Sequence, residues 1–175
     1  DSNVTFTISL PVVALSGRYI SATATDPFGN TSEFSTNVFA QSIVAGTTFT
    51  VVNTNNSGAG SLRQAIIDAN ANISAGDTIA FAITNLTTTI NPASALPPII
   101  DPVIIDGHTQ PGAVVNTSAS VYNAVLPVRL SGVGVTGDGL LITAGSCTVR
   151  GLMITGFSGD GIEISNLGGN TISGN

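Results

Sequence analysis

Near its end the chain reads Gly137-Asp138-Gly139-Leu140-Leu141-Ile142, and 22 residues later it reads Gly159-Asp160-Gly161-Ile162-Glu163-Ile164. A second pair has almost the same spacing, because Cys147-Thr148-Val149-Arg150-Gly151 returns 23 residues later as Asn170-Thr171-Ile172-Ser173-Gly174. Short apolar triplets that repeat at such a period, separated by glycine, are typical of the successive turns of a parallel β-solenoid. The two copies predict that their apolar triplets lie one above the other.

The composition favours an all-β protein. Of the 175 residues, 42% are hydrophobic, which is enough for a buried core in one domain or slightly more than one. Only 8% are charged, and there is no lysine and no tryptophan, so Thr, Ser, Asn and Gly must build the polar surface. Neutral hydroxyl and amide side chains can stack along neighbouring strands without the repulsion that like charges would cause.

Charge and hydropathy exclude two kinds of partner. The net charge is −6 and Lys and Arg together number 4, whereas nucleic-acid binding depends on clustered lysine and arginine. No run of apolar residues approaches the roughly 20 that a membrane-spanning helix needs. We therefore expect neither nucleic-acid binding nor membrane insertion.

Asn-x-Ser/Thr triplets indicate an exported protein with an extracellular or cell-surface location. They begin at Asn3, Asn30, Asn55, Asn72, Asn85 and Asn116. The single cysteine, Cys147, allows no internal disulfide, and Asn170 takes its place in the next copy of the repeat. We expect Cys147 to be a small residue that faces the interior.

Residues 1–40 are predicted to form antiparallel strands. Polar and apolar residues alternate at the start, which is the period of a half-buried strand, and the apolar set is Val4, Phe6, Ile8 and Leu10. A second strand is expected around Ile20, a turn at residues 26–30, where Pro and Gly stand, and a third strand near Phe34. Residues 41–46 are expected to form a flexible linker.

One helix is predicted. Ser61, followed three residues later by Gln64, forms the capping-box pattern. An apolar stripe at helical spacing follows, made of Leu62, Ala65, Ile66 and Ala69. The first turn of a solenoid exposes unpaired backbone groups, and this stripe, laid over that end, would hide its apolar interior. Arg63 lies off the stripe, and we expect it to bond to backbone carbonyls or to Asp68 or Asp77.

Two stretches resemble known families. Residues 21–35, SATATDPFGNTSEFS, resemble the closing strands of immunoglobulin-like modules that alternate with β-helices in large secreted bacterial proteins, which implies a partial immunoglobulin-like β-sandwich over 1–40. Residues 58–70, GAGSLRQAIIDAN, are similar to the leader of parallel β-helix proteins of the pectate-lyase-like superfamily. This second resemblance extends over 47–175 and implies a right-handed parallel β-helix that begins with a capping α-helix.

Asp138 and Asp160 occupy equivalent positions in the repeat, so we expect them about 5 Å apart, at strand spacing. Two close carboxylates could bind Ca²⁺ or act as an acid/base pair with a raised pKa. The alternative is that Asp-Gly forms a turn in each copy. Leu141 stands at the position equivalent to Glu163, which favours the turn. We expect no catalytic residue and no cofactor, with Ca²⁺ the one candidate.

A second candidate group is Asp101, Asp106 and His108. An Asp/His cluster suits acid/base chemistry or metal binding, but Asp-Gly at 106–107 also reads as a turn, and no second histidine accompanies His108. Superfamily members that cleave acidic polysaccharide use a carboxylate-bound Ca²⁺ and a basic residue on one solenoid face. Arg129 and Arg150 do not define such a set.

Three functions remain open. We favour a non-catalytic extracellular structural or adhesive module that self-associates head-to-tail into a surface filament or sheath through open β edges. The predicted edges are the first strand and the last repeat, with Val4, Phe6, Ile8, Leu10, Asn170 and Ile172. The alternatives are a polysaccharide lyase or hydrolase and a module that binds a surface polysaccharide. An aromatic content of 5% disfavours the binding module, since sugars usually stack on aromatic rings.

Overall fold

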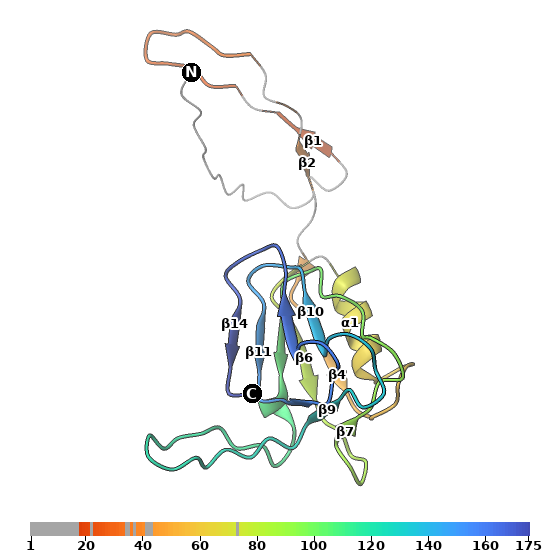
Figure 1. Cartoon of the computed structure of the whole chain (residues 1–175). Coiled ribbons are helices and arrows are strands. Elements are labelled where there is room, and N and C mark those ends of the chain that lie inside the picture. Colours follow the sequence, from red (N-terminus) through yellow and green to blue (C-terminus); the bar gives the residue numbers. More distant parts are fainter. Residues whose placement is uncertain (1–17, 22, 34–35, 37, 41–43, 73) are drawn as a thin grey trace. The chain divides into compact units, whose positions relative to one another are not determined.

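The structure is a computed structural model that describes residues 18–21, 23–33, 36, 38–40, 44–72 and 74–175 (Figure 1). The chain divides into two compact units, Asp1–Ile43 and Val44–Asn175. The apolar set of the predicted first strand, Val4, Phe6, Ile8 and Leu10, lies outside the described residues.

The first unit contains a pair of short antiparallel strands, β1 (Arg18–Ile20) and β2 (Val38–Ala40). The predicted turn follows β1, because the Asp26 carboxylate accepts the backbone N–H of Asn30 at 2.9 Å and its side-chain amide at 2.9 Å. These hydrogen bonds lower the pKa of Asp26 below its ordinary value. The partner strand β2 begins after Phe34, which itself lies outside the described residues.

The second unit is built from short strands. Their bounds are β3 Val44–Ala45, β4 Thr48–Val51, β5 Ser74–Ala75, β6 Asp77–Phe81, β7 Thr89–Ile90, β8 Val103–Asp106, β9 Arg129–Ser131, β10 Leu140–Ile142, β11 Thr148–Arg150, β12 Met153–Thr155, β13 Ile162–Ile164 and β14 Thr171–Ser173. One helix, α1, spans Leu62–Ala71.

Parallel sheets dominate this unit (Figure 1). The largest sheet has five strands in the order β14-β11-β8-β6-β4, and a second has three in the order β12-β9-β7. The pairs β10 with β13 and β3 with β5 are also parallel. The β-rich class predicted from the composition is therefore confirmed. Among the described strands no sheet closes on itself.

The repeat in the sequence corresponds to strand pairs in the structure. Leu140 of β10 pairs with Ile162 of β13, and Thr148 of β11 pairs with Thr171 of β14, both in parallel register. The prediction that the two copies lie one above the other is confirmed. Each copy supplies one strand to each of two sheets.

Apolar side chains stack along the five-stranded sheet. The register places Phe49, Ile79, Ile105, Val149 and Ile172 in one row across its strands. The three middle members are fully buried. Burying such a side chain stabilises a fold by about 1.5–3 kcal/mol, so this row is a main part of the core. Its two ends are less covered, since Phe49 is half-buried and Ile172 is exposed.

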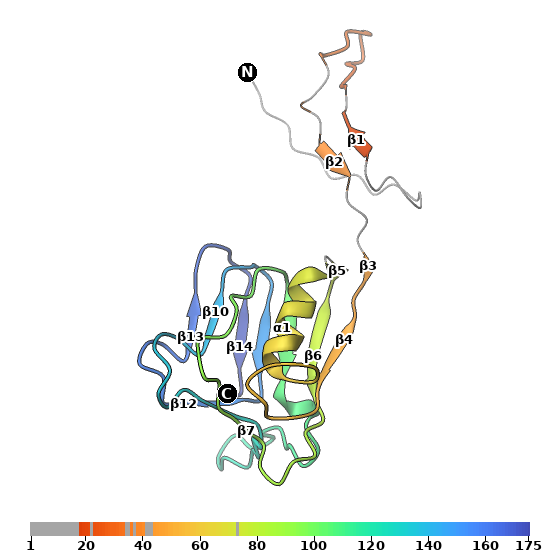
Figure 2. The same cartoon turned by 90° about the vertical axis from the view of Figure 1, so that its right-hand side faces the viewer.

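Helix α1 packs against β4 and β6 (Figure 2). Its buried residues are the predicted stripe, Leu62, Ala65, Ile66 and Ala69. Ser61 caps the helix, because its hydroxyl accepts the backbone N–H of Gln64 at 3.2 Å. Only half of the predicted capping box forms. The Gln64 side-chain amide donates to the Asp68 carboxylate at 2.8 Å, and the backbone N–H of Ser61 donates to the carbonyl of Gly58 and not to Gln64.

Candidate functional site

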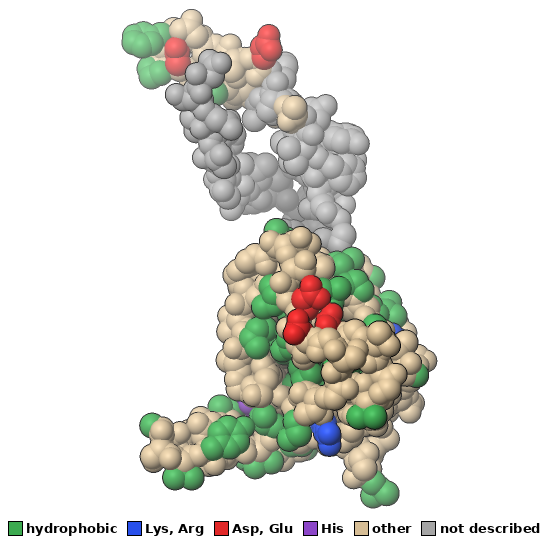
Figure 3. Space-filling model, viewed as in Figure 1, with side chains coloured by type: hydrophobic (Ala, Val, Ile, Leu, Met, Phe, Trp, Pro, Cys, Tyr) green, Lys and Arg blue, Asp and Glu red, His purple; other side chains and the backbone are tan. Residues whose placement is uncertain are grey.

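Three carboxylates gather where β10 and β13 begin, and Figure 3 shows acidic side chains together on one face. The Asp138 carboxylate accepts the backbone N–H of Asp160 at 2.6 Å. A hydrogen bond with Asp138, and then the negative charges of Asp138 and Asp160, raise the pKa of Glu163 above its ordinary value. Asp138 thus anchors the turn of the next copy, which supports the turn interpretation.

This group does not form a metal centre of the usual kind. In the part of the chain that the structure describes, no group of three or more His, Cys, Asp or Glu side chains is placed to hold a metal ion. Ca²⁺ binding at Asp138 and Asp160 therefore stays a prediction without structural support.

A second polar group lies at the end of β8, where a 3₁₀ turn, η1 (Gly107–Thr109), begins. Asp106 is largely buried, and its carboxylate accepts hydrogen bonds from Arg150 Nη2 at 2.6 Å and from the backbone N–H of His108 at 3.0 Å. The His108 ring nitrogen Nδ1 lies 3.6 Å from the same carboxylate. The hydrogen bond and charge of Asp106 raise the pKa of Arg150.

The sequence predicted Asp106 and His108 as neighbours but not Arg150, which is 44 residues from Asp106. The pairing of β11 with β8 sets Arg150 directly beside Asp106. Aligning the segment Cys147-Thr148-Val149 with Val103-Ile104-Ile105 would have found this contact. Asp101, the third predicted member, lies before the start of β8 and is not part of the group.

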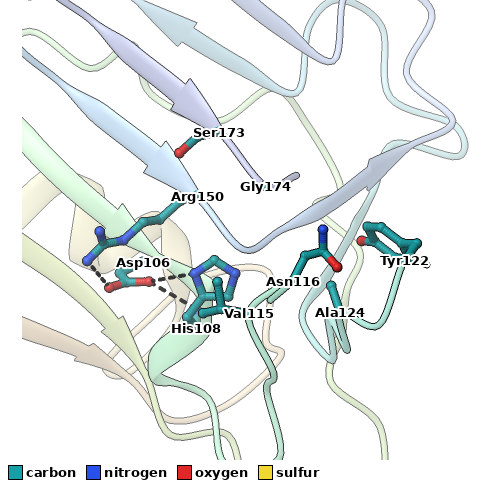
Figure 4. Close-up of a pocket in the computed structure, with 9 residues that line it drawn as sticks. All are labelled: Asp106, His108, Val115, Asn116, Tyr122, Ala124, Arg150, Ser173 and Gly174. Atoms are coloured by element: carbon teal, nitrogen blue, oxygen red, sulfur yellow. Dashed lines mark hydrogen bonds and ion pairs between the residues drawn. The ribbon is translucent and has the colours of Figure 1, made fainter. Parts of the chain in front are cut away.

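An arm at residues 113–125 leaves the body near this group (Figure 1). Two backbone hydrogen bonds of 2.9 Å between Val114 and Val125 hold its base. A hollow of about 440 Å³ lies between the arm and the ends of β8, β11 and β14 (Figure 4). It is lined by Asp106, His108, Val115, Asn116, Tyr122, Ala124, Arg150, Ser173 and Gly174. Sequence analysis missed this hollow because the arm has no periodic pattern.

The last strands have free edges. Within the described residues β12, β13 and β14 each pair on one side only, with β9, β10 and β11. Four large apolar side chains are exposed on or beside these strands: Met153 is 43% exposed, Ile164 48%, Leu167 59% and Ile172 41%.

Asn170, a predicted edge residue, uses its side chain within the chain. Its Oδ1 accepts the backbone N–H of Cys147 at 2.8 Å, and its Nδ2 donates to the carbonyl of Leu167 at 2.9 Å. Cys147 is buried, with a free thiol, as the sequence predicted. Burial raises the pKa of the Cys147 thiol. Asn170 therefore joins successive turns of the chain.

No helix in the described ranges has the length and hydropathy to cross a membrane. Comparison of the chain with protein families, with curated proteins and with solved structures finds no match. The functional argument therefore depends on the geometry alone.

Proposed function

We propose that residues 47–175 are the capped start of a right-handed parallel β-helix, preceded over 1–40 by part of an immunoglobulin-like β-sandwich. We further propose that the protein is a non-catalytic extracellular structural or adhesive module, which assembles head-to-tail into a surface filament or sheath. Parallel pairing of successive copies supports the solenoid, and crossover connections between parallel strands are nearly always right-handed. A composition that is rich in Thr and Asn and has only 8% charged residues supports an exported surface protein.

The single observation that carries the assembly is the free edge of β14 with Ile172 exposed beside it. In the stacked row Val149 is fully buried, whereas Ile172, its neighbour on β14, is 41% exposed. An unpaired strand edge with an apolar side chain is a template for a further strand. A partner strand would pair its backbone and cover Ile172 in one step.

The partner is a second copy of this chain, through β4. This strand is the opposite edge of the same sheet, and it carries Phe49, the half-buried first member of the row. Joining β14 to β4 of the next copy would continue the row from Ile172 to Phe49. The two surfaces differ, so the contact is heterologous and builds an open fibre when the rotation does not close.

A lysine at the edge tests this assembly. Ile172→Lys is expected to abolish high-molecular-weight species in light scattering and fibres in negative-stain microscopy, because a charge would be buried between stacked rows. Val133→Lys is the matched control, since Val133 is 77% exposed and lies on no strand. A wild-type protein that is solely monomeric, or an Ile172→Lys variant that assembles like Val133→Lys, would overturn the proposal.

A further inference from the structure

The arm carries apolar side chains that its own copy of the chain leaves exposed. Residues 113–125 include no charged residue. Val121 is 66% exposed and Tyr122 is 70% exposed. The large apolar side chains exposed on the arm are Val114, Val115, Val121, Tyr122 and Val125. Exposed apolar side chains gathered on one segment mark an interaction surface.

Hydrogen bonds hold the arm in one shape. Asn123 Oδ1 accepts the backbone N–H of Thr117 at 2.9 Å, and Asn116 Oδ1 accepts the backbone N–H of Asn123 at 3.1 Å. Nearer the tip, the Ser118 hydroxyl accepts the backbone N–H of Val121 at 3.1 Å. A surface that is already ordered loses less conformational entropy when it binds a partner. The arm is therefore organised for contact before any partner arrives.

The arm points along the direction in which the strands stack. In the five-stranded sheet β4 is one edge and β14 is the other. Figure 1 shows the arm below the ends of these strands, reaching past β14 on the side away from β4. The free edge of β14 is where the next copy of the chain attaches in the assembly proposed above. The arm thus extends toward the place of that next copy.

The register shows what the arm would meet there. Asp106, Arg150 and Ser173 pair in one row across β8, β11 and β14, and all three line the hollow beside the arm. In β4 the same row holds Thr50, so Thr50 of the next copy would follow Ser173. Val52 comes directly after the end of β4 and is 44% exposed. It offers the arm an exposed apolar side chain at the strand ends of the next copy.

Pairing of the strand edges alone gives a small contact. Strand β14 has three residues, whereas a stable interface takes about 20–30 residues from each partner. An arm that reaches over the next copy adds contact area on a second side. Because the arm is uncharged, its docking adds no repulsion between copies that each have a net charge of −6.

We propose that the arm is a clamp that docks on a second copy of this chain, with Val121 and Tyr122 packed against Val52 beyond the end of β4. The inference rests on the assembly proposed above, because the two copies must be joined from β14 to β4 for the arm to reach. It adds a second interaction surface, which holds the copies together once the strands have paired.

Two substitutions on the arm test the clamp. Val121→Asp and Tyr122→Ser are each expected to raise the protein concentration needed for assembly about tenfold or more in light scattering. The first would bury an unpaired charge, and the second removes an aromatic anchor. Val133→Asp is the matched control, since Val133 is 77% exposed and lies off the arm, and it should assemble like wild type. Circular dichroism verifies that each variant is folded.

The Ile172→Lys variant separates the clamp from the assembly itself. If wild type assembles, Ile172→Lys does not, and both arm variants assemble like Val133→Asp, then the strand pairing stands and the clamp is wrong. A wild-type protein that is solely monomeric would remove both proposals together.

A pair of cysteines locates the contact. Val121→Cys with Val52→Cys is expected to give a ladder of disulfide-linked oligomers on a non-reducing gel after mild oxidation. Val121→Cys with Thr48→Cys is the control, because Thr48 lies at the other end of β4, about 13 Å from Val52 at strand spacing. A disulfide formed within one copy, or a ladder no stronger than that of the control, would contradict the clamp.

Discussion

Individual amide side chains hold this chain together where strand pairing stops. Gln110 is buried, accepts the backbone N–H of Ile83 at 2.8 Å and donates to its carbonyl at 2.9 Å. Asn175 does the same between two residues, accepting from Leu152 N at 3.0 Å and donating to the Val149 carbonyl at 2.9 Å. A buried backbone group left unpaired costs about 1–3 kcal/mol. Neutral amide side chains, and not the few charged residues, therefore satisfy these backbone groups.

Glu163 gives a prediction on pH. Its pKa is raised in the folded state by Asp138 and then by Asp160, so ionised Glu163 opposes folding. Protonated Glu163 therefore favours the folded state. This stabilisation is complete below the ordinary pKa of a glutamate, about 4.3, and is lost as the pH rises through the raised pKa. Glu163→Gln should therefore melt higher than wild type at neutral pH, and the difference should shrink in mild acid.

The melting temperatures are measured by circular dichroism at low salt, where screening between exposed charges is weakest. Glu33→Gln, in the other unit, is the control for loss of one negative charge. A Glu163→Gln variant that melts below wild type at neutral pH, or whose advantage is the same at both pH values, would contradict the assignment.

At the scale of the elements, one arginine ties α1 to two loops. Arg63 donates from Nε to the carbonyl of Asn56 at 3.0 Å, from Nη1 to Ala95 at 2.7 Å and from Nη2 to Ser94 at 2.8 Å. The sequence predicted that Arg63 bonds to backbone carbonyls or to Asp68 or Asp77, and the structure shows the backbone carbonyls. Three planar donors bind carbonyls from two separate segments, which lysine cannot do.

Replacing this arginine should loosen the helix. Arg63→Lys is expected to lower the free energy of unfolding by about 1–3 kcal/mol in urea unfolding, because at least two carbonyls lose their donors. Arg129→Lys is the control, because the one side-chain bond described for Arg129 runs from Nε to the Thr155 hydroxyl at 3.0 Å, so its loss should cost less than about 1 kcal/mol. Equal losses in the two variants would show that Arg63 has no special role.

For the whole molecule, the outer face of the five-stranded sheet predicts a register for the proposed assembly. Its register places Thr48, Thr78, Ile104, Thr148 and Thr171 in one row. In a fibre that continues this sheet, Thr171 of one copy lies beside Thr48 of the next, at a strand spacing of about 4.8 Å. That spacing falls within the Cα separation, about 4.4–6.8 Å, that a disulfide spans.

A pair of cysteines tests that register. The double variant Thr48→Cys with Thr171→Cys is expected to form a ladder of disulfide-linked oligomers on a non-reducing gel after mild oxidation. Thr48→Cys with Val133→Cys is the control, since Val133 lies off the sheet. The native Cys147 is buried and should not contribute. Cross-linking no greater than in the control would rule out pairing of β14 with β4.

The parts of the fold that were predictable depend on local spacing. The stripe of α1 follows from a period near 3.6 residues, and the register of Leu140 on Ile162 follows from the repeat. The predicted hydrogen bond from the backbone N–H of Ser61 to the Gln64 side chain was wrong, because Asp68 offers Gln64 a partner one helical turn away. Such competition between side chains is not visible in the motif itself.

Periodicity and composition alone determined that the second unit stacks parallel strands under one amphipathic helix, because these patterns show which face of each short segment is buried. Only the tertiary structure decided that Arg150 neutralises Asp106, that Gln110 holds Ile83, and that an arm makes a hollow over the sheet. These contacts join residues 27 to 44 positions apart or depend on a loop without a period. Local spacing holds no information about them, since they arise from how the turns are registered in space.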